Sequence, residues 1–202
     1  MAGVPPFVDD PTDTREAIMA ATFQALSRHG YADLTIQRIG DEFEKSKSLL
    51  YHHYDGKDEL LLDFLEFMLD RFEETVPPED PDGAGDHLDT ILDHVLLEAD
   101  DGDFFGAMVE LRAQAAHDQA YRDHFTRSDA HHREGLADLI RSGIDEGVFR
   151  AVDPEATATF IHTAVLGSMV QRATAEGPVG RTIRDELDAY LRSELLVERS
   201  PE

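Results

Sequence analysis

The chain has 202 residues, a hydrophobic fraction of 41% and no cysteine, which excludes disulfides, thiolate metal ligands and cysteine nucleophiles. Its formal net charge is −25 at pH 7, which argues against a general affinity for nucleic acid. No apolar run is long enough to span a membrane, and the start, MAGVPPFVDDPTDT, lacks the basic and apolar parts of a signal peptide. We therefore expect a soluble, unexported, cytoplasmic protein.

The charge is unevenly distributed along the chain. All three lysines, Lys45, Lys47 and Lys57, lie in residues 14–57, where six bases balance six acids. Residues 58–202 carry twelve arginines against thirty-four acids. Such acidity with scarce lysine is typical of halophilic proteins, because molar salt screens repulsion beyond roughly 3 Å. Only residues 14–57 remain as a candidate for nucleic-acid contact.

Apolar residues recur at helical spacing, and alternating β-branched runs are absent, so we predict an all-α fold of about nine helices. The predicted helices cover residues 14–29, 35–43, 46–54, 57–76, 86–99, 103–117, 119–146, 154–176 and 181–197. Gly30 is predicted to end the first helix, while Thr35 and Ser46 are predicted to cap the next two. The run PPEDPDGAG after the fourth helix is the clearest break in the chain.

The two short helices, joined by a tight connection, are typical of a helix-turn-helix. The second helix of such a motif enters the major groove, so it needs apolar residues inward, here Leu50 and Tyr54, and polar residues outward. The outward residues are Lys47, Ser48, Tyr51 and His52. The three lysines flank this helix, and each could neutralise a phosphate.

Residues 35–61, TIQRIGDEFEKSKSLLYHHYDGKDELL, resemble the signature of the TetR family, in which a threonine-capped helix leads to L-Y-x-H/Y-F/Y and then K-x-x-L. The resemblance covers residues 12–72, including the first helix with its H-G-Y ending. Two positions depart from the pattern. Phe43-Glu44-Lys45 stands where the family commonly has Ala-Gly-Val, and Ser48 stands at a position where glycine is common.

The resemblance implies an N-terminal three-helix DNA-binding domain at 12–72, with its helix-turn-helix at 35–54. It also implies a C-terminal helical domain at 86–197 for effector binding and dimerisation. The expected function is that of a ligand-responsive repressor, which binds a palindromic double-stranded DNA operator as a homodimer and responds to an unidentified small-molecule effector. Residues 104–176 resemble, more loosely, the C-terminal domain of BetI regulators, which suggests a helix layout but no ligand. No cofactor is expected.

The resemblance also implies individual DNA contacts. These are Thr35, Lys45, Ser46, Lys47, Ser48, Leu49, Tyr51, His52 and Lys57. Thr35, Tyr51 and Lys57 would bind backbone phosphates. The residues that would face base edges are Lys47, Ser48, Leu49 and His52. Leu49 can equally be interpreted as a core residue, and His53 is interpreted as a packed histidine rather than a contact.

The C-terminal half contains candidates for two further sites. Candidate effector-binding residues are His94, Phe104, Phe105, Met108, Tyr121, Phe125, His162 and Met169. Candidate dimer-interface residues are Ala164, Val165, Gly167, Ser168, Ile183, Leu187, Tyr190 and Leu191. Aromatic and methionine residues at helical spacing are also common in a plain core, and each interface candidate could instead pack within its own domain.

Two other classes of function were compared with the regulator. An enzyme is disfavoured because Ser48 and His52 share a helix face, whereas His53 and Asp55 do not point toward it, and no nucleophile elbow is present. A metal-sensing regulator with His and carboxylate ligands in the C-terminal domain is the alternative, with His117, His124 and His131-His132 as its strongest features. Their spacing forms no compact motif, so no metal site is assigned.

Overall fold

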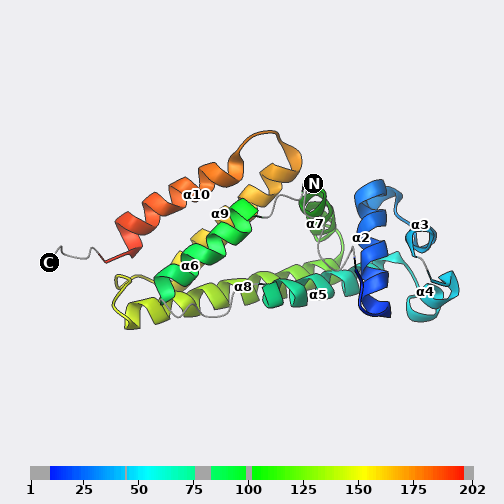
Figure 1. The fold of residues 1–202 in the computed structure, drawn as a ribbon, viewed down its shortest axis with the longest axis horizontal. Coiled ribbons are helices and arrows are strands. Elements are labelled where there is room, and N and C mark those ends of the chain that lie inside the picture. Colours follow the sequence, from blue (N-terminus) through cyan, green and yellow to red (C-terminus); the bar gives the residue numbers. More distant parts are fainter. Residues whose placement is uncertain (1–9, 44, 76–82, 99–101, 198–202) are drawn as a thin grey trace. The chain divides into compact units, whose positions relative to one another are not determined.

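The computed structural model describes residues 10–43, 45–75, 83–98 and 102–197, which contain nine α-helices, two π-helical turns and no strand (Figure 1). The α-helices are α2 (Thr14–Asp33), α3 (Ile36–Glu42), α4 (Lys47–His53), α5 (Lys57–Thr75), α6 (Ala84–Asp93), α7 (Gly102–Gln114), α8 (Gln119–Asp145), α9 (Pro154–Thr174) and α10 (Val179–Tyr190). The π-helical turns are η1 (His94–Glu98) and η2 (Leu191–Leu195). The predicted all-α class is confirmed.

The helix ends follow local signals in the sequence. Asp13 begins α2 by accepting a hydrogen bond from the Glu16 N–H at 2.8 Å. Gly30 interrupts α2 with φ 67° and ψ 163°, a left-handed conformation that costs glycine little, and one more turn then runs to Asp33. Glu44, where the TetR signature commonly has glycine, lies outside the described residues.

The described residues form two compact units that do not follow the predicted linear boundary between residues 72 and 86. The N-terminal unit contains residues 10–73 and 102–126, and the C-terminal unit contains residues 83–98 and 127–197. Helix α7 therefore belongs to the N-terminal unit, where it packs against α2. Hydrophobic periodicity could not reveal this, because it shows which face of a helix is buried but not which helix covers it.

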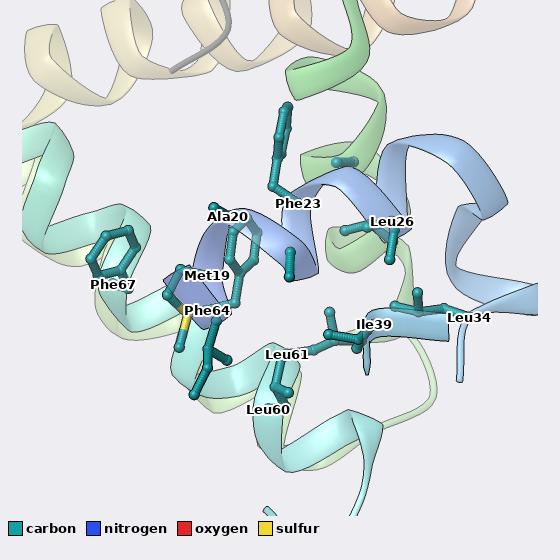
Figure 2. Close-up of a cluster of buried hydrophobic side chains, with 14 of the residues drawn as sticks. Met19, Ala20, Phe23, Leu26, Leu34, Ile39, Leu60, Leu61, Phe64 and Phe67 are labelled. Carbon is teal, nitrogen blue, oxygen red and sulfur yellow. The ribbon is translucent and has the colours of Figure 1, made fainter. Parts of the chain in front are cut away.

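The core of the N-terminal unit joins α2, α3 and α5 (Figure 2). Its labelled side chains include Met19, Phe23, Leu26, Ile39, Leu60, Leu61 and Phe64. Ile39 from α3 and Leu50 from α4 have no exposed surface, although each belongs to a helix of only seven residues. This core therefore fixes the two short helices in place.

The C-terminal unit has a separate apolar core, which combines residues of α6, η1, α8, α9, α10 and η2. One charged group is buried at its edge. The Arg184 guanidinium on α10 donates to Asp93 at 2.6 Å and Asp89 at 3.0 Å on α6, and also to Asp188. Burial of a guanidinium is tolerable here because three carboxylates compensate it, and the pairs join α6 to α10.

Gly143 is where α8 and the turn after it pack most tightly. The Val148 and Phe149 N–H groups both donate to the Gly143 carbonyl, at 3.0 and 2.9 Å, and the buried Phe149 ring lies over the glycine. A Cβ at residue 143 would overlap this ring.

We expect Gly143→Ala to lower the free energy of unfolding by roughly 1–3 kcal/mol, because the added methyl group would displace the Phe149 ring. Thermal and urea denaturation measure this change.

Gly135 on the same helix provides the matched control. No described atom lies within 4 Å of a Cβ added there, and the residue is exposed. Gly135→Ala should therefore raise the free energy of unfolding by roughly 0.5–1 kcal/mol, because alanine has the higher helix propensity. Equal stability of the two variants would contradict the proposed packing of Phe149.

Candidate nucleic-acid interface

Helices α3 and α4 form a helix-turn-helix. The Thr35 hydroxyl accepts a hydrogen bond from the Arg38 N–H at 3.2 Å, so the predicted cap of α3 is confirmed. Ser46 occupies the predicted N-cap position of α4, but its hydroxyl makes no capping bond and lies 2.7 Å from the Ser48 hydroxyl. Weak capping of α4 makes its tertiary anchoring more important.

The inward face of α4 supplies that anchoring. Leu50 is fully buried, and Leu49 and Tyr54 pack against the same core. The Tyr54 hydroxyl donates to Asp63 on α5. Burial, reinforced by this hydrogen bond, raises the pKa of Tyr54 further above neutral pH. The middle and the C-terminal end of α4 are thereby held on the N-terminal core.

The outward face of α4 is polar and accessible, as its spacing predicted. Lys47, Ser48 and His52 are exposed, and Tyr51 retains 51% of its accessible surface. Thr35 at the start of α3 is exposed as well. These residues are available to DNA, and their contacts with it remain predictions.

His53 differs from its interpretation as a packed histidine, because it is exposed. Its ring lies 5.5 Å from the His52 ring and 6.3 Å from the Tyr54 ring, centroid to centroid. Helix α4 ends at His53, so helical spacing no longer determines which way the next residues face. Gln37, on α3, is also exposed and was not among the predicted contacts.

The three lysines have different surroundings. Lys47 pairs with Asp41, but their side chains are 52% and 62% exposed, so this ion pair contributes only about 0–1 kcal/mol and a phosphate could replace the carboxylate. Lys45 Nζ donates to the Thr14 hydroxyl at 3.1 Å. Lys57 Nζ donates to the Tyr31 carbonyl at 2.9 Å and lies 4.1 Å from the Tyr31 ring centroid. Lys57 is therefore engaged within its own unit.

The candidate effector residues are divided between the two units. Those in the N-terminal unit are Phe104, Phe105, Met108, Tyr121 and Phe125, whereas His94, His162 and Met169 belong to the C-terminal unit. Phe105 and Tyr121 are buried, and the Phe104 ring lies 6.3 Å from that of Phe23. These aromatic residues therefore build the N-terminal core, which is the alternative interpretation of their spacing.

One effector candidate of the C-terminal unit, His162, makes a polar contact between α9 and α8. His162 on α9 is 7% exposed, and its ring centroid lies 5.9 Å from that of His132. The His162 Nε2 lies 4.0 Å from an Asp129 carboxylate oxygen. This cluster is polar, and it is the part of the effector prediction that a plain hydrophobic core does not explain.

Three of the predicted dimer-interface residues must be corrected. Ser168, Leu187 and Leu191 are buried within the protomer, so their side chains cannot form an exposed contact surface. The other five retain some exposure, namely Ala164, Val165, Gly167, Ile183 and Tyr190. The sequence identified apolar residues of α9 and α10 but could not separate the inward face of α9 from its outward face, because both faces of this helix carry small and apolar residues.

Nowhere in the described ranges do three or more His, Asp or Glu side chains come together in a way that could hold a metal ion. None of the described helices is long and apolar enough to cross a membrane.

Comparison with known proteins decides the family. Residues 84–196 match a family model described as the C-terminal part of BetI-type transcriptional repressors, and residues 18–64 match one for bacterial regulatory proteins of the tetR family. The chain belongs to the TetR family.

Similar proteins support this TetR assignment over nearly the whole chain. A TetR regulator from Haloarcula marismortui is 36% identical, with a TM-score of 0.84 over 90% of this chain and 97% of that one. The transcriptional repressor AcnR of Corynebacterium glutamicum is 23% identical over 85% of this chain and 88% of its own. A regulator from Saccharomonospora viridis, solved in complex with choline, shares the fold at 20% identity, with a TM-score of 0.75 over 91% and 98% of the two chains.

This member of the TetR family is thus a DNA-binding transcriptional repressor. Its relatives are transcriptional regulators rather than enzymes. The predicted family resemblance, fold class and general function are confirmed. No comparison supports the metal-sensing alternative.

Lys47 is expected to read bases, whereas Tyr51 is expected to hold a phosphate. Lys47→Ala should therefore change the ranking of operator sequences, with roughly 1–3 kcal/mol lost at the base it contacts. Tyr51→Phe should weaken binding similarly on all sequences, because phosphate contacts carry no sequence information. Fluorescence anisotropy on a panel of single-base operator variants distinguishes the two patterns.

Lys45→Ala is the matched control for loss of one positive charge beside the same helix. It should reduce affinity uniformly, as Tyr51→Phe does. If Lys47→Ala leaves both the affinity and the ranking of sequences unchanged, α4 does not read DNA through this face.

Proposed function

We propose that this TetR-family chain is a ligand-responsive repressor that binds a palindromic operator as a homodimer in the cytoplasm. The observation that carries the proposal is the construction of α4. Leu50 anchors the helix in the core, while Lys47, Ser48 and Tyr51 are exposed on it. In a chain of net charge −25, this helix with its flanking lysines is the surface best suited to meet DNA.

Base recognition by α4 would follow ordinary major-groove chemistry. A lysine such as Lys47 can donate to the O6 and N7 acceptors of guanine, and Leu49, at the edge of the core, can contact a thymine methyl group. Ser48 and His52 can exchange hydrogen bonds with either kind of base edge. Lys45 and Tyr51 would fix the position of α4 through the backbone phosphates.

The acidic surface supports a further part of the proposal, that the protein works in concentrated salt. The chain has 43 acidic residues against 18 basic ones, and a relative comes from Haloarcula marismortui. At molar ionic strength, repulsion between exposed carboxylates is screened within roughly 3 Å. Counterion release then contributes little to DNA affinity, so directed contacts from α4 would carry more of it.

Thermal denaturation in KCl tests this adaptation to salt. Raising the concentration from about 0.1 M to about 2 M should raise the melting temperature, because it screens the carboxylates from one another. Each kcal/mol gained corresponds to roughly 2–4 °C for a chain of this size. Sucrose at matched water activity is the control for general preferential exclusion. A melting temperature that is constant or falls with KCl would contradict the halophilic interpretation.

The dimer would form through the outward face of α9. Exposed residues follow one another along this face at helical spacing, namely Phe160, Thr163, Gly167 and Val170. Phe160 and Val170 are 49% and 40% exposed, and two large apolar side chains that share one exposed face favour a contact with a partner. The Phe160 ring lies 4.7 Å from that of Tyr190, so α10 would border the same surface.

Gly167→Arg tests both the dimer and the palindrome. No described atom lies within 4 Å of a Cβ at Gly167, so arginine fits the isolated protomer but would clash with a second copy on this face. We expect the wild type to be a dimer by analytical ultracentrifugation. From random duplexes it should select inverted repeats with half-sites about 34 Å, or one helical turn, apart. The variant should be monomeric and should select no inverted repeat.

Gly135→Arg is the control for adding an arginine, because Gly135 is also exposed and uncrowded but lies on α8. It should remain dimeric and select the same repeats. A dimeric Gly167→Arg protein would overturn the assigned face. Failure of the wild type to enrich any duplex would overturn the repressor proposal itself.

The effector would be a small organic molecule bound by the domain at residues 86–197. The BetI-type match of residues 84–196 and the polar contact between His162 and Asp129 support this assignment. A genome-wide map of bound sites would name the regulated genes, whose products indicate which compounds to test for release of the operator.

A further inference from the structure

Four elements of the N-terminal unit meet at Tyr31, the residue that follows the Gly30 interruption of α2. The Tyr31 N–H donates to a carboxylate oxygen of Glu110 on α7. The Tyr31 carbonyl accepts a hydrogen bond from Lys57 Nζ at 2.9 Å, and the Tyr31 hydroxyl donates to Asp58 at 3.0 Å. Lys57 and Asp58 both belong to α5. Side chains from two other helices thus hold the backbone of Tyr31 on both its donor and its acceptor side.

Tyr121, near the start of α8, completes the cluster. Its ring stands perpendicular to that of Tyr31 with centroids 6.3 Å apart, and its hydroxyl donates to the same Asp58 oxygen at 3.3 Å. Burial raises the pKa of both tyrosines further above neutral pH, and each hydroxyl donates to the carboxylate. Tyr121 is 1% exposed, so it has little freedom to move independently of its surroundings.

This cluster lies immediately before the helix-turn-helix. After Tyr31 the chain passes through the buried Leu34 to Thr35, the cap of α3. Leu34 is tied back to the cluster, because its N–H donates to the Tyr31 carbonyl at 3.3 Å. The position of the Tyr31 backbone therefore sets where α3 begins, and α4 packs on α3.

We propose that Glu110 and Tyr121 are positioning residues for operator binding, which act on α3 and α4 through Tyr31. Neither residue lies within residues 18–64, which match the family's DNA-binding model, and neither is near the outward face of α4 in sequence. The inference rests on the proposed function, since it assigns a role in binding the same operator. It also gives Lys57 a different role from its predicted phosphate contact, because its ammonium group is already engaged by Tyr31.

The sign of the charge change makes Glu110 a sharp test. Removing a carboxylate makes the acidic protein less repulsive to DNA, so electrostatics alone predicts tighter binding by Glu110→Ala. Loss of the hydrogen bond from the Tyr31 N–H predicts weaker binding instead. One charge-assisted hydrogen bond lost from the DNA-binding arrangement would raise the dissociation constant about tenfold. The two explanations therefore predict opposite changes in the dissociation constant.

The experiment measures the affinity of full-length dimers for the duplex that the wild type selects, by fluorescence anisotropy, with active fractions from stoichiometric titration. Glu110→Ala should weaken binding by about tenfold, and Glu110→Gln, which keeps an acceptor oxygen, should recover part of the loss. Asp123→Asn, on an exposed residue of α8 with a contact to Gln119, is the control for the change in charge. It should bind at least as tightly as the wild type.

A double-mutant cycle distinguishes positioning from general damage to the fold. Glu110→Ala and Lys57→Ala both act through Tyr31, so their combined loss of affinity should be smaller than the product of the separate losses. Glu110→Ala and Lys47→Ala affect different groups, so their losses should multiply. Lys57→Ala should also leave the salt dependence of binding unchanged, whereas loss of a phosphate contact would reduce the slope by about 0.9.

Should Glu110→Ala fail to fold, Glu110→Gln and Tyr121→Phe take its place in the cycle, since each removes less from the cluster. The inference would be overturned if Glu110→Ala, Glu110→Gln and Tyr121→Phe all bound the duplex with wild-type affinity. It would also be overturned if the loss of affinity in Glu110→Ala multiplied with the loss in Lys57→Ala. The proposed function would stand in either case. If the wild type itself selects no duplex, the proposed function falls and this inference falls with it.

Discussion

The burial of Ile39 and Leu50 in the N-terminal core is the interaction on which the DNA-reading surface depends. Helices α3 and α4 have seven residues each, and isolated helices of that length are unstable in water. Packing against α2 and α5 therefore supplies the stability that the short helices lack. Because Leu50 must point inward, Ser48 and His52, on the opposite side of the helix, are turned outward, so the same constraint that stabilises α4 also presents its polar face.

Electrostatics determines how the few cations of the molecule are used. In a chain of net charge −25, several basic groups pair with carboxylates, and some of these pairs join helices, as Arg184 does between α10 and α6. The lysines near α4 are not used to join helices through buried ion pairs in this way. Lys47 has only an exposed, easily replaced partner in Asp41, whereas Lys57 is held by the Tyr31 carbonyl and ring. The sequence places both lysines beside α4 as candidate DNA contacts, and only their surroundings show that Lys57 is already engaged.

Much of the site could be predicted, because its signals are local. The Thr35 cap and the inward spacing of Leu50 each depend on residues within one or two turns, whereas Gly30, predicted to end the first helix, only interrupts it before a last turn to Asp33. The sequence did not reveal the membership of α7 in the N-terminal unit, the exposure of His53, or the burial of Leu187 within the protomer. Each of these depends on which helix covers a given face, and hydrophobic periodicity does not carry that information.

The sequence by itself determined the positions of the helices, the family signature at residues 35–61 and the confinement of lysine to the segment that would meet phosphate. Only the tertiary structure decided that Glu110 and Tyr121 would meet Tyr31, across 79 residues in the case of Glu110. The reason is physical. Caps and helical spacing are set by neighbours along the chain, whereas a hydrogen bond between distant residues exists only after the core has brought their helices together.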